Sequence, residues 1–206
     1  MQLYATQMIL SPMAQIRLRV TDTYSLHRLV MDLFPHRYDD QGSELLSGIQ
    51  WVDCGEHIFG REIRILSKNP PCLLNLDGSG FEDVKIVTNL IPETFFSKEY
   101  YRFSLLANPC VCKNTGQRVP ILDEVEIARW MDIKSENSGF VVVGKNIDRI
   151  KPLIFNKGKN RITLHTARIS GILKVQDKEK FVEVVGRGIG RGRAWGLGLL
   201  QLSLKV

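Results

Sequence analysis

The sequence predicts an α+β protein built from two successive halves with the same order of elements. Each half opens with a strand-like run that ends before a proline, Leu3 to Leu10 before Pro12 and Tyr100 to Ala107 before Pro109. A helical pattern follows in each half, and then runs with the composition of strands. This order, found twice, implies two tandem ferredoxin-like (RRM-like) βαββαβ domains, although the halves share no sequence repeat.

The helix of the first half is predicted by its caps and its periodicity. Thr21, Asp22 and Thr23 offer N-caps, and Pro35 ends the helix. Its apolar residues recur at i, i+3, i+4, i+7 and i+8: Leu26, Leu29, Val30, Leu33 and Phe34.

The rest of the first half is predicted to be strands and loops. A polar loop over 36–44 precedes strands over 45–53 and 58–66, which a short glycine-containing turn joins. Residues 73–90 fit no single element and contain a loop at Gly78-Ser79-Gly80.

The candidate linker Ile91-Pro92-Glu93 divides the chain into domains over 1–93 and 94–206. After a loop over 116–120, a helix over 122–131 begins with acidic residues that complement its dipole. The remaining predicted elements are strands over 151–156 and 161–175, a short helix from its cap Asp177 to Gly186, and a closing leucine-rich strand.

Charge is unevenly distributed along the 206 residues, whose formal net charge is +6. Residues 1–144 hold 14 basic and 18 acidic side chains, a balance of −4, whereas residues 145–206 hold 14 basic and 4 acidic, a balance of +10. A strongly basic C-terminal third favours a face that binds nucleic acid. A membrane-surface helix fits less well, because the basic residues lie in glycine loops and strands.

The four cysteines, Cys54, Cys72, Cys110 and Cys112, indicate free thiols rather than a metal site. No C-x-x-C occurs, and the single C-x-C has no partner pair. The first ten residues lack a basic signal-peptide region, and no window resembles a membrane span. We therefore expect a cytoplasmic protein with no metal, no cofactor and no membrane attachment.

The stretch 186–204 combines glycine, arginine and leucine. Arg187, Arg191 and Arg193 alternate with glycines, and the leucines from Leu197 to Leu204 predict a mostly buried strand. Backbone N–H groups exposed by glycine, with guanidinium groups alongside, suit phosphate oxygens. The spacing matches neither a dinucleotide fingerprint nor a Walker loop. A solvated flexible loop before a core strand is the alternative, and the basic C-terminal third favours the polyanion site.

Tyr24 and His27 lie three residues apart on the first predicted helix and therefore share a face. That face lies beside the apolar stripe, so we expect His27 to be partly exposed. The positive end of the helix dipole disfavours imidazolium there, and neutral imidazole is a competent general base. Tyr24 could orient a hydroxyl or phosphate oxygen. A surface histidine beside a half-packed tyrosine fits the same spacing.

The run Lys157-Gly158-Lys159-Asn160-Arg161 predicts a hairpin tip that projects three cations. Such a tip suits the backbone phosphates of A-form RNA, with little base readout and strong salt dependence. The arginine loop lies in the same basic third, so the two could flank one duplex. His165 shares a strand face with Arg161 and Thr163, which fits an RNA contact or an ordinary sheet histidine.

Four segments, in this order, resemble the CasE-type CRISPR RNA endoribonucleases, which process precursor CRISPR RNA in the type I-E Cascade complex. They are Tyr24-Ser-Leu-His27-Arg28 running to Leu33-Phe34-Pro35, Tyr101-Arg-Phe-Ser-Leu-Leu-Ala-Asn108-Pro109, Gly116-Gln-Arg-Val-Pro120 with Trp130 on the following helix, and Gly188-Ile-Gly190 leading to Trp195-Gly-Leu-Gly198-Leu-Leu200. Together they span nearly the whole chain, and the family has two tandem ferredoxin-like domains. Residues 68–97 match no part of the family pattern.

The resemblance implies metal-independent cleavage of precursor CRISPR RNA at the 3′ base of the repeat stem-loop. The 2′-hydroxyl upstream of the scissile phosphate attacks in line, leaving a 2′,3′-cyclic phosphate (or 3′-phosphate) and a 5′-hydroxyl. His27 falls on the family's catalytic histidine and Tyr24 on its tyrosine. The implied partners are a CRISPR repeat RNA hairpin, which the enzyme keeps after cleavage, and the other Cascade subunits.

The resemblance also places the family's basic hairpin at 157–161 and its glycine-rich loop around 188–198. Arg28 is expected to stabilise phosphorane charge because it adjoins His27. The residues expected to bind RNA are Arg28, Lys157, Lys159, Arg161, Arg191 and Arg193.

Two other functions remain open. A non-catalytic module with the same tandem fold would bind structured RNA, and Tyr24 and His27 would then only pack or bind. A phosphate-handling enzyme would use the glycine loop on a nucleotide, although neither a Walker nor a Rossmann spacing supports it.

Overall fold

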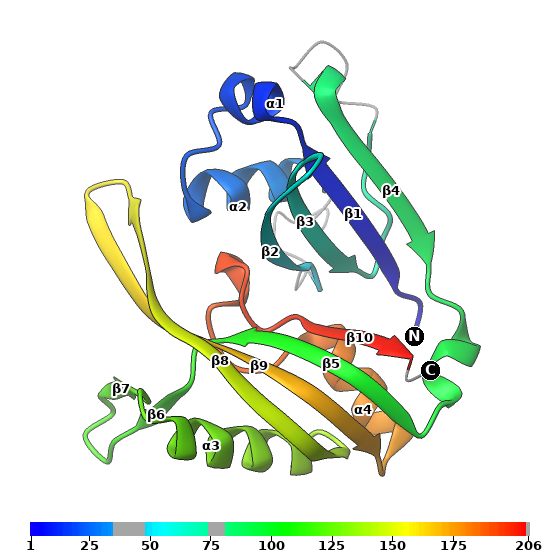
Figure 1. Ribbon diagram of the computed structural model, residues 1–206, viewed down its shortest axis with the longest axis vertical. Helices are drawn as coiled ribbons and strands as arrows, with labels where there is room; N and C mark the ends of the chain where they lie inside the picture. Colours follow the sequence, from blue (N-terminus) through cyan, green and yellow to red (C-terminus); the bar gives the residue numbers. More distant parts are fainter. Residues whose placement is uncertain (35–47, 74–80, 205–206) are drawn as a thin grey trace, which may run out of the picture. The chain divides into compact units, whose positions relative to one another are not determined.

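Two compact units make up the computed structural model, which describes residues 1–34, 48–73 and 81–204 (Figure 1). The first unit is Met1–Ile91 with the short segment Ala194–Gly196, and the second is Pro92–Arg193 with Leu197–Val206. Each holds a four-stranded antiparallel sheet, in the order β2-β3-β1-β4 and β10-β5-β9-β8. If the four strands of each sheet are numbered in chain order, the first strand lies between the third and the fourth, as in a ferredoxin-like domain. The predicted fold class is confirmed.

The first unit begins with β1, which forms the centre of its sheet. Its elements are β1 (Tyr4–Leu10), α1 (Pro12–Arg17), α2 (Thr23–Asp32), β2 (Gln50–His57), β3 (Gly60–Ser67), the 3-10 turn η2 (Phe81–Asp83) and β4 (Val84–Leu90). Helix α1 was not predicted from the sequence. It forms because Ser11 Oγ accepts a hydrogen bond from Ala14 N at 3.0 Å and Pro12 starts the helix, where its missing N–H costs nothing.

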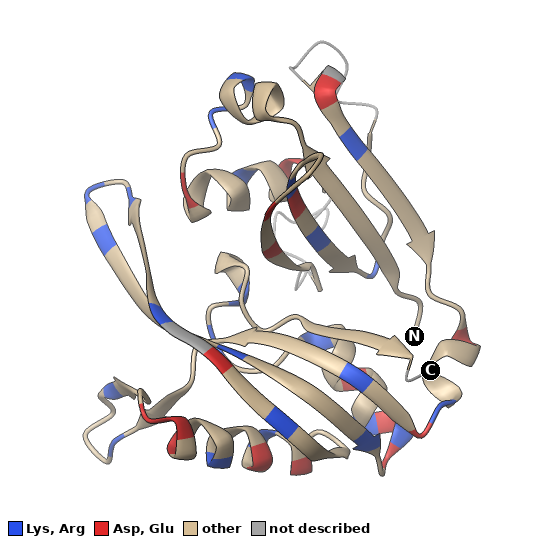
Figure 2. Cartoon of the chain, in the orientation of Figure 1, with Lys and Arg blue, Asp and Glu red and all other residues tan. Residues whose placement is uncertain are grey.

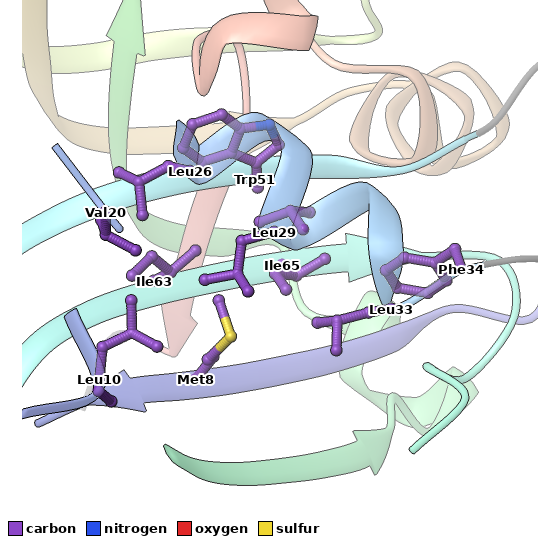
Figure 3. Packing of buried hydrophobic residues seen from close by; sticks show 12 residues of the cluster. Met8, Leu10, Val20, Leu26, Leu29, Leu33, Phe34, Trp51, Ile63 and Ile65 are labelled. Atoms are coloured by element: carbon purple, nitrogen blue, oxygen red, sulfur yellow. The ribbon is translucent and has the colours of Figure 1, made fainter. Parts of the chain in front are cut away.

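Helix α2 begins as predicted, with Asp22 as its N-cap. The Asp22 carboxylate accepts a hydrogen bond from Ser25 N at 2.9 Å, and Ser25 Oγ accepts one from Asp22 N at 3.0 Å. This reciprocal cap fixes the start of the helix. The apolar stripe of α2 packs on one face of the sheet (Figure 3). The buried cluster is Met8, Leu10, Ala14, Val20, Leu26, Leu29, Val30, Leu33, Phe34, Trp51, Ile63 and Ile65.

The turn between β2 and β3 differs from the prediction. It lies at Ile58 and Phe59, which are 89% and 72% exposed, and not at Gly55. Gly55 instead sits in a β-bulge, where the register with β3 shifts and the backbone has φ +87°. Its N–H donates to Asp53 Oδ1 at 2.9 Å, a local side-chain hydrogen bond within the bulged strand.

The ambiguous residues 73–90 contain η2 and β4, which closes the sheet beside β1. Between β3 and β4 the described residues, 68–73 and 81–83, form no α-helix. The predicted loops at 36–44 and Gly78-Ser79-Gly80, like Pro35, lie outside the described residues.

In the second unit, β5 (Tyr100–Ala107) matches its predicted strand and follows the 3-10 turn η3 (Glu93–Ser97). Helix α3 (Glu124–Glu136) is capped by Asp123, whose carboxylate accepts from Glu126 N at 3.0 Å. The predicted loop at 116–120 is in part a small hairpin, β6 (Cys110–Cys112) with β7 (Arg118–Pro120). The later elements are β8 (Phe140–Lys157), β9 (Asn160–Val175), α4 (Lys178–Arg187) and β10 (Leu200–Leu204). The 3-10 turn η4 (Arg193–Trp195) lies at the division, since Arg193 belongs to this unit and Ala194 and Trp195 group with the first.

Four elements of the second unit have bounds other than those predicted. Helix α3 begins at Glu124 and ends at Glu136, rather than running from 122 to 131. Strand β8 has 18 residues rather than the short run 151–156, because it pairs with β9 along its length through two irregularities. Helix α4 runs to Arg187, and Gly188, with φ +82°, ends it in place of Gly186. Only Leu200–Leu204 forms the last strand. Leu197 and Leu199 are buried in the loop before it, and Leu204 is 44% exposed.

No helix in the described ranges has the length and apolar character needed to cross a bilayer.

Candidate functional site

Tyr24 and His27 occupy the second and fifth positions of α2, on the edge of the helix beside its buried stripe. Both side chains are half-buried, and Arg28 next to them is exposed. Because the capping box fixes the helix start and Leu26, Leu29 and Val30 are buried below it, the backbone that carries both side chains is firmly held. The predicted partial exposure of His27 is found.

A third aromatic residue, Trp195, packs against this pair within the first unit. The Trp195 ring centroid lies 5.1 Å from that of His27 and 6.1 Å from that of Tyr24, with interplanar angles of 58° and 45°. These separations are typical of favourable tilted aromatic contacts. Trp195 comes from the three-residue segment Ala194–Gly196, which groups with the first unit although its neighbours in sequence belong to the second.

Trp51 of β2 holds that segment on both sides of Trp195. Its Nε1–H donates to the Ala194 carbonyl oxygen at 3.2 Å. Gly196 lies on its indole ring with φ +74°, so that a Cβ there would come within 2.8 Å of Trp51 Cζ3. Since Trp51 is 1% exposed and part of the buried cluster, the segment rests on a fixed surface.

The resulting cluster brings an imidazole, a phenol and an indole together near the N-terminal end of one helix. The imidazole can accept or donate a proton, and the phenol can donate a hydrogen bond to an oxygen. The helix N-terminus favours negative charge nearby. The arrangement is suited to proton transfer at an anionic group such as a phosphodiester.

The three cations of the predicted hairpin lie at the tip of the β8–β9 ribbon (Figure 2). Lys157, Lys159 and Arg161 are exposed, and Gly158 makes the turn with φ +60°. Strand β5 pairs with β9 only over Ala167–Lys174, so the stretch from 151 to 166 continues as a two-stranded ribbon beyond the sheet of this unit (Figure 1). The ribbon can therefore reach into a groove that a flat sheet could not enter.

The glycine-rich loop of the second unit is held by backbone hydrogen bonds. Ile189 N donates to Gly198 O at 2.8 Å, and Gly198 N donates to Leu106 O at 2.8 Å. Arg191 and Arg193 are exposed on it, and Arg193 Nη1 donates to Arg187 O at 2.8 Å. The loop thus presents two guanidinium groups from a fixed backbone.

The structure brings Tyr24, His27 and Arg28 together on α2, and it groups Lys157, Lys159 and Arg161 on the ribbon tip. Trp195 was expected only as part of the family resemblance, and Trp51 was not singled out. The hydrogen bond from Trp51 to the Ala194 carbonyl joins positions 143 residues apart, which no local pattern predicts. The one local signal for this contact is that Trp195 is followed directly by a glycine, Gly196, which can lie against an aromatic ring.

The described residues contain no group of three or more His, Cys, Asp or Glu side chains placed to hold a metal ion. The four cysteines are free thiols.

Comparison with known proteins supports the family resemblance. The chain is 27% identical over 115 residues to CRISPR-associated endoribonuclease Cse3 of Thermus thermophilus. The matched region covers 50% of this chain and 54% of the relative. It is 29% identical over 86 residues to CRISPR system Cascade subunit CasE of Escherichia coli, covering 42% and 43%. The chain thus spans about half the length of the curated relatives it matches.

The fold of the whole chain also has a solved counterpart. The structure of Thermus thermophilus Cse3 bound to an RNA representing a pre-cleavage complex superposes with a TM-score of 0.82 and 21% identity, covering 99% of this chain and 100% of that one. The two chains therefore share their fold. The sequence matches to Cse3 and CasE confirm the predicted resemblance to CasE-type proteins. The family model described as CRISPR associated protein matches residues 3–203. The chain belongs to this family of CRISPR-associated proteins.

Proposed function

We propose that this chain is an endoribonuclease that cleaves precursor CRISPR RNA at the 3′ base of the repeat stem-loop without a metal ion. The observation that carries the proposal is the cluster on α2, where His27 and Tyr24 share one edge of a capped helix. The family and the names of its relatives, an endoribonuclease and a Cascade subunit, supply the substrate class.

The reaction is transesterification within the RNA. The 2′-oxygen upstream of the scissile phosphate bonds to phosphorus, and the 5′-oxygen of the next nucleotide leaves. The 2′-hydroxyl loses its proton and the leaving oxygen gains one, so the products are a 2′,3′-cyclic phosphate (or a 3′-phosphate after hydrolysis) and a 5′-hydroxyl. No redox step occurs.

His27 performs acid–base work in this scheme, which typically contributes about 10²–10⁴-fold in rate. The Tyr24 hydroxyl positions the attacking or leaving oxygen. Arg28 is exposed one residue after His27 and stabilises the charge that builds on the phosphorane oxygens.

RNA binding is assigned to the basic elements of the second unit. Lys157, Lys159 and Arg161 grip the stem backbone from the ribbon tip, and Arg191 and Arg193 contact phosphates from the glycine-rich loop. The first domain, over 1–93, would carry the catalytic pair, and the second, over 94–206, would carry the grip. Strong binding to the product stem would keep the cleaved RNA on the protein as part of Cascade.

The test is cleavage of a hairpin repeat RNA in excess EDTA by the wild type and His27→Ala. The matched control is His57→Ala, which removes an exposed histidine at the β2–β3 turn. The wild type and the control should make one cut with a cyclic phosphate end, and His27→Ala should bind RNA without cutting it. Equal cutting by all three proteins would show that His27 is not part of the active site. Binding without cutting by the wild type would favour the alternative, a non-catalytic module for structured RNA.

A further inference from the structure

We propose that Trp195 is a positioning residue for this reaction, acting through the His27 imidazole and the Tyr24 phenol. The inference rests on the proposed function. It comes from the ring contacts of Trp195 and from the way its backbone is fixed.

The position of the indole is set by its neighbours in sequence. Trp51 Nε1 binds the Ala194 carbonyl on one side, and Gly196 lies against the Trp51 ring on the other. Backbone fixed on both sides of a residue leaves its side chain few directions to point. Trp195 is therefore presented to α2 from a rigid support, and no catalytic loop needs to fold over the site to bring it there.

The indole meets both members of the proposed catalytic pair. Its centroid is 5.1 Å from that of His27 and 6.1 Å from that of Tyr24. A side chain in contact with two others that are three residues apart on a helix limits the rotamers of both. His27 Nδ1 is buried from solvent, so the imidazole is open to water on part of its surface only.

Proton transfer depends on the direction of the imidazole nitrogens as well as on the presence of the ring. Misplacing a reacting group by about 1 Å can cost about 10²-fold in rate. The indole has no group that transfers protons at neutral pH, so its contribution is the orientation of His27 and Tyr24.

The experiment measures single-turnover cleavage of a hairpin repeat RNA by the full chain, with protein in saturating excess and EDTA present. The variants are Trp195→Ala and Trp195→Phe. The control is Tyr100→Ala, which removes a partly exposed aromatic ring that lies under Lys174 in the second unit. RNA affinity is measured separately, and the imidazole Hε1 resonance of His27 is assigned by its disappearance in His27→Gln.

We expect Trp195→Ala to cleave about 10–100-fold more slowly at saturation with unchanged RNA affinity. The His27 resonance should move because the ring current of the indole is lost. Trp195→Phe keeps an aromatic ring in place and should recover most of the rate, which separates positioning from a folding defect. Tyr100→Ala should match the wild type.

If the wild type cuts, any of three results would overturn the inference. An unchanged rate in Trp195→Ala, with a wild type that cuts, refutes it while leaving the proposed function intact. Weaker RNA binding by Trp195→Ala, with an unchanged cleavage rate at saturation, would show that Trp195 contacts RNA rather than positioning His27. A slower rate with an unmoved His27 resonance would place its effect elsewhere. If the wild type itself does not cut in any of these assays, the proposed function fails first and the inference fails with it.

Discussion

Replacing Gly196 by alanine should test whether the segment that carries Trp195 is held against Trp51. A Cβ at this position would lie 2.8 Å from Trp51 Cζ3 and 3.0 Å from its Cε3 and Cη2, whereas carbon atoms pack at about 3.5–4.0 Å. Trp51 is 1% exposed within the buried cluster, so it has little room to withdraw. The backbone at 196 also has φ +74°, where an alanine is strained.

The size of the effect has two parts. The left-handed backbone costs an alanine about 1–2 kcal/mol. Overpacking against a core side chain typically adds about 1–3 kcal/mol. Gly196→Ala should therefore lower the free energy of unfolding by about 2–5 kcal/mol. Alternatively, the segment should lift away from Trp51, and the hydrogen bond from Trp51 Nε1 to the Ala194 carbonyl oxygen should be lost.

Gly55→Ala is the matched control. Gly55 has φ +87° on the same strand as Trp51, but a Cβ there meets nothing within 4 Å. This variant should show the backbone strain alone. Urea unfolding, followed by circular dichroism and tryptophan fluorescence, gives both values, and single-turnover cleavage should fall in Gly196→Ala only. Equal losses of stability in the two variants, with equal cleavage, would refute the proposed support of Trp195 by Trp51.

Two further predictions concern charge. Replacing Lys157, Lys159 or Arg161 by alanine should reduce the slope of log RNA affinity against log salt concentration by about one ion per residue. The control Lys113→Ala, on the β6–β7 turn, should leave this slope unchanged. Equal slopes in all variants would exclude the ribbon tip from the RNA interface. Burial raises the pKa of Glu62, but hydrogen bonds from Arg64 and Gln7, both at 2.8 Å, outweigh it and hold this pKa below its ordinary value. A carboxyl group whose pKa is lower in the folded protein stabilises the fold above its unfolded-state pKa, and this stabilisation is lost as the pH falls through the folded-state pKa. In urea unfolding, the wild type should therefore lose more stability than Glu62→Gln between about pH 6 and pH 3. Parallel losses in the two proteins would contradict this prediction.

Elements with a local cause were predictable from the sequence. Helix α2 follows from its cap at Asp22 and its apolar repeat, and the hairpin tip follows from Gly158 between lysines, because caps and turns are formed by residues close together in the chain. The order of these elements was enough to predict two ferredoxin-like sheets. Elements whose boundaries depend on a partner strand were placed less well. Strand β8 extends far beyond its apolar run because β9 pairs with it, and Gly55 proved to be a bulge because Asp53 binds its N–H.

The candidate site divides in the same way. The sequence alone determined that Tyr24 and His27 share a helix edge, since residues three apart on a helix are neighbours whatever packs on them. It also determined that the cations cluster in the last third of the chain. Only the tertiary structure decided that Trp195 lies against both side chains, because that contact depends on Trp51 and Gly196, which meet across 145 positions of chain. A local pattern reflects what a residue's neighbours in sequence require of it. This contact joins two segments far apart in the chain, so it exists only once the first unit has folded.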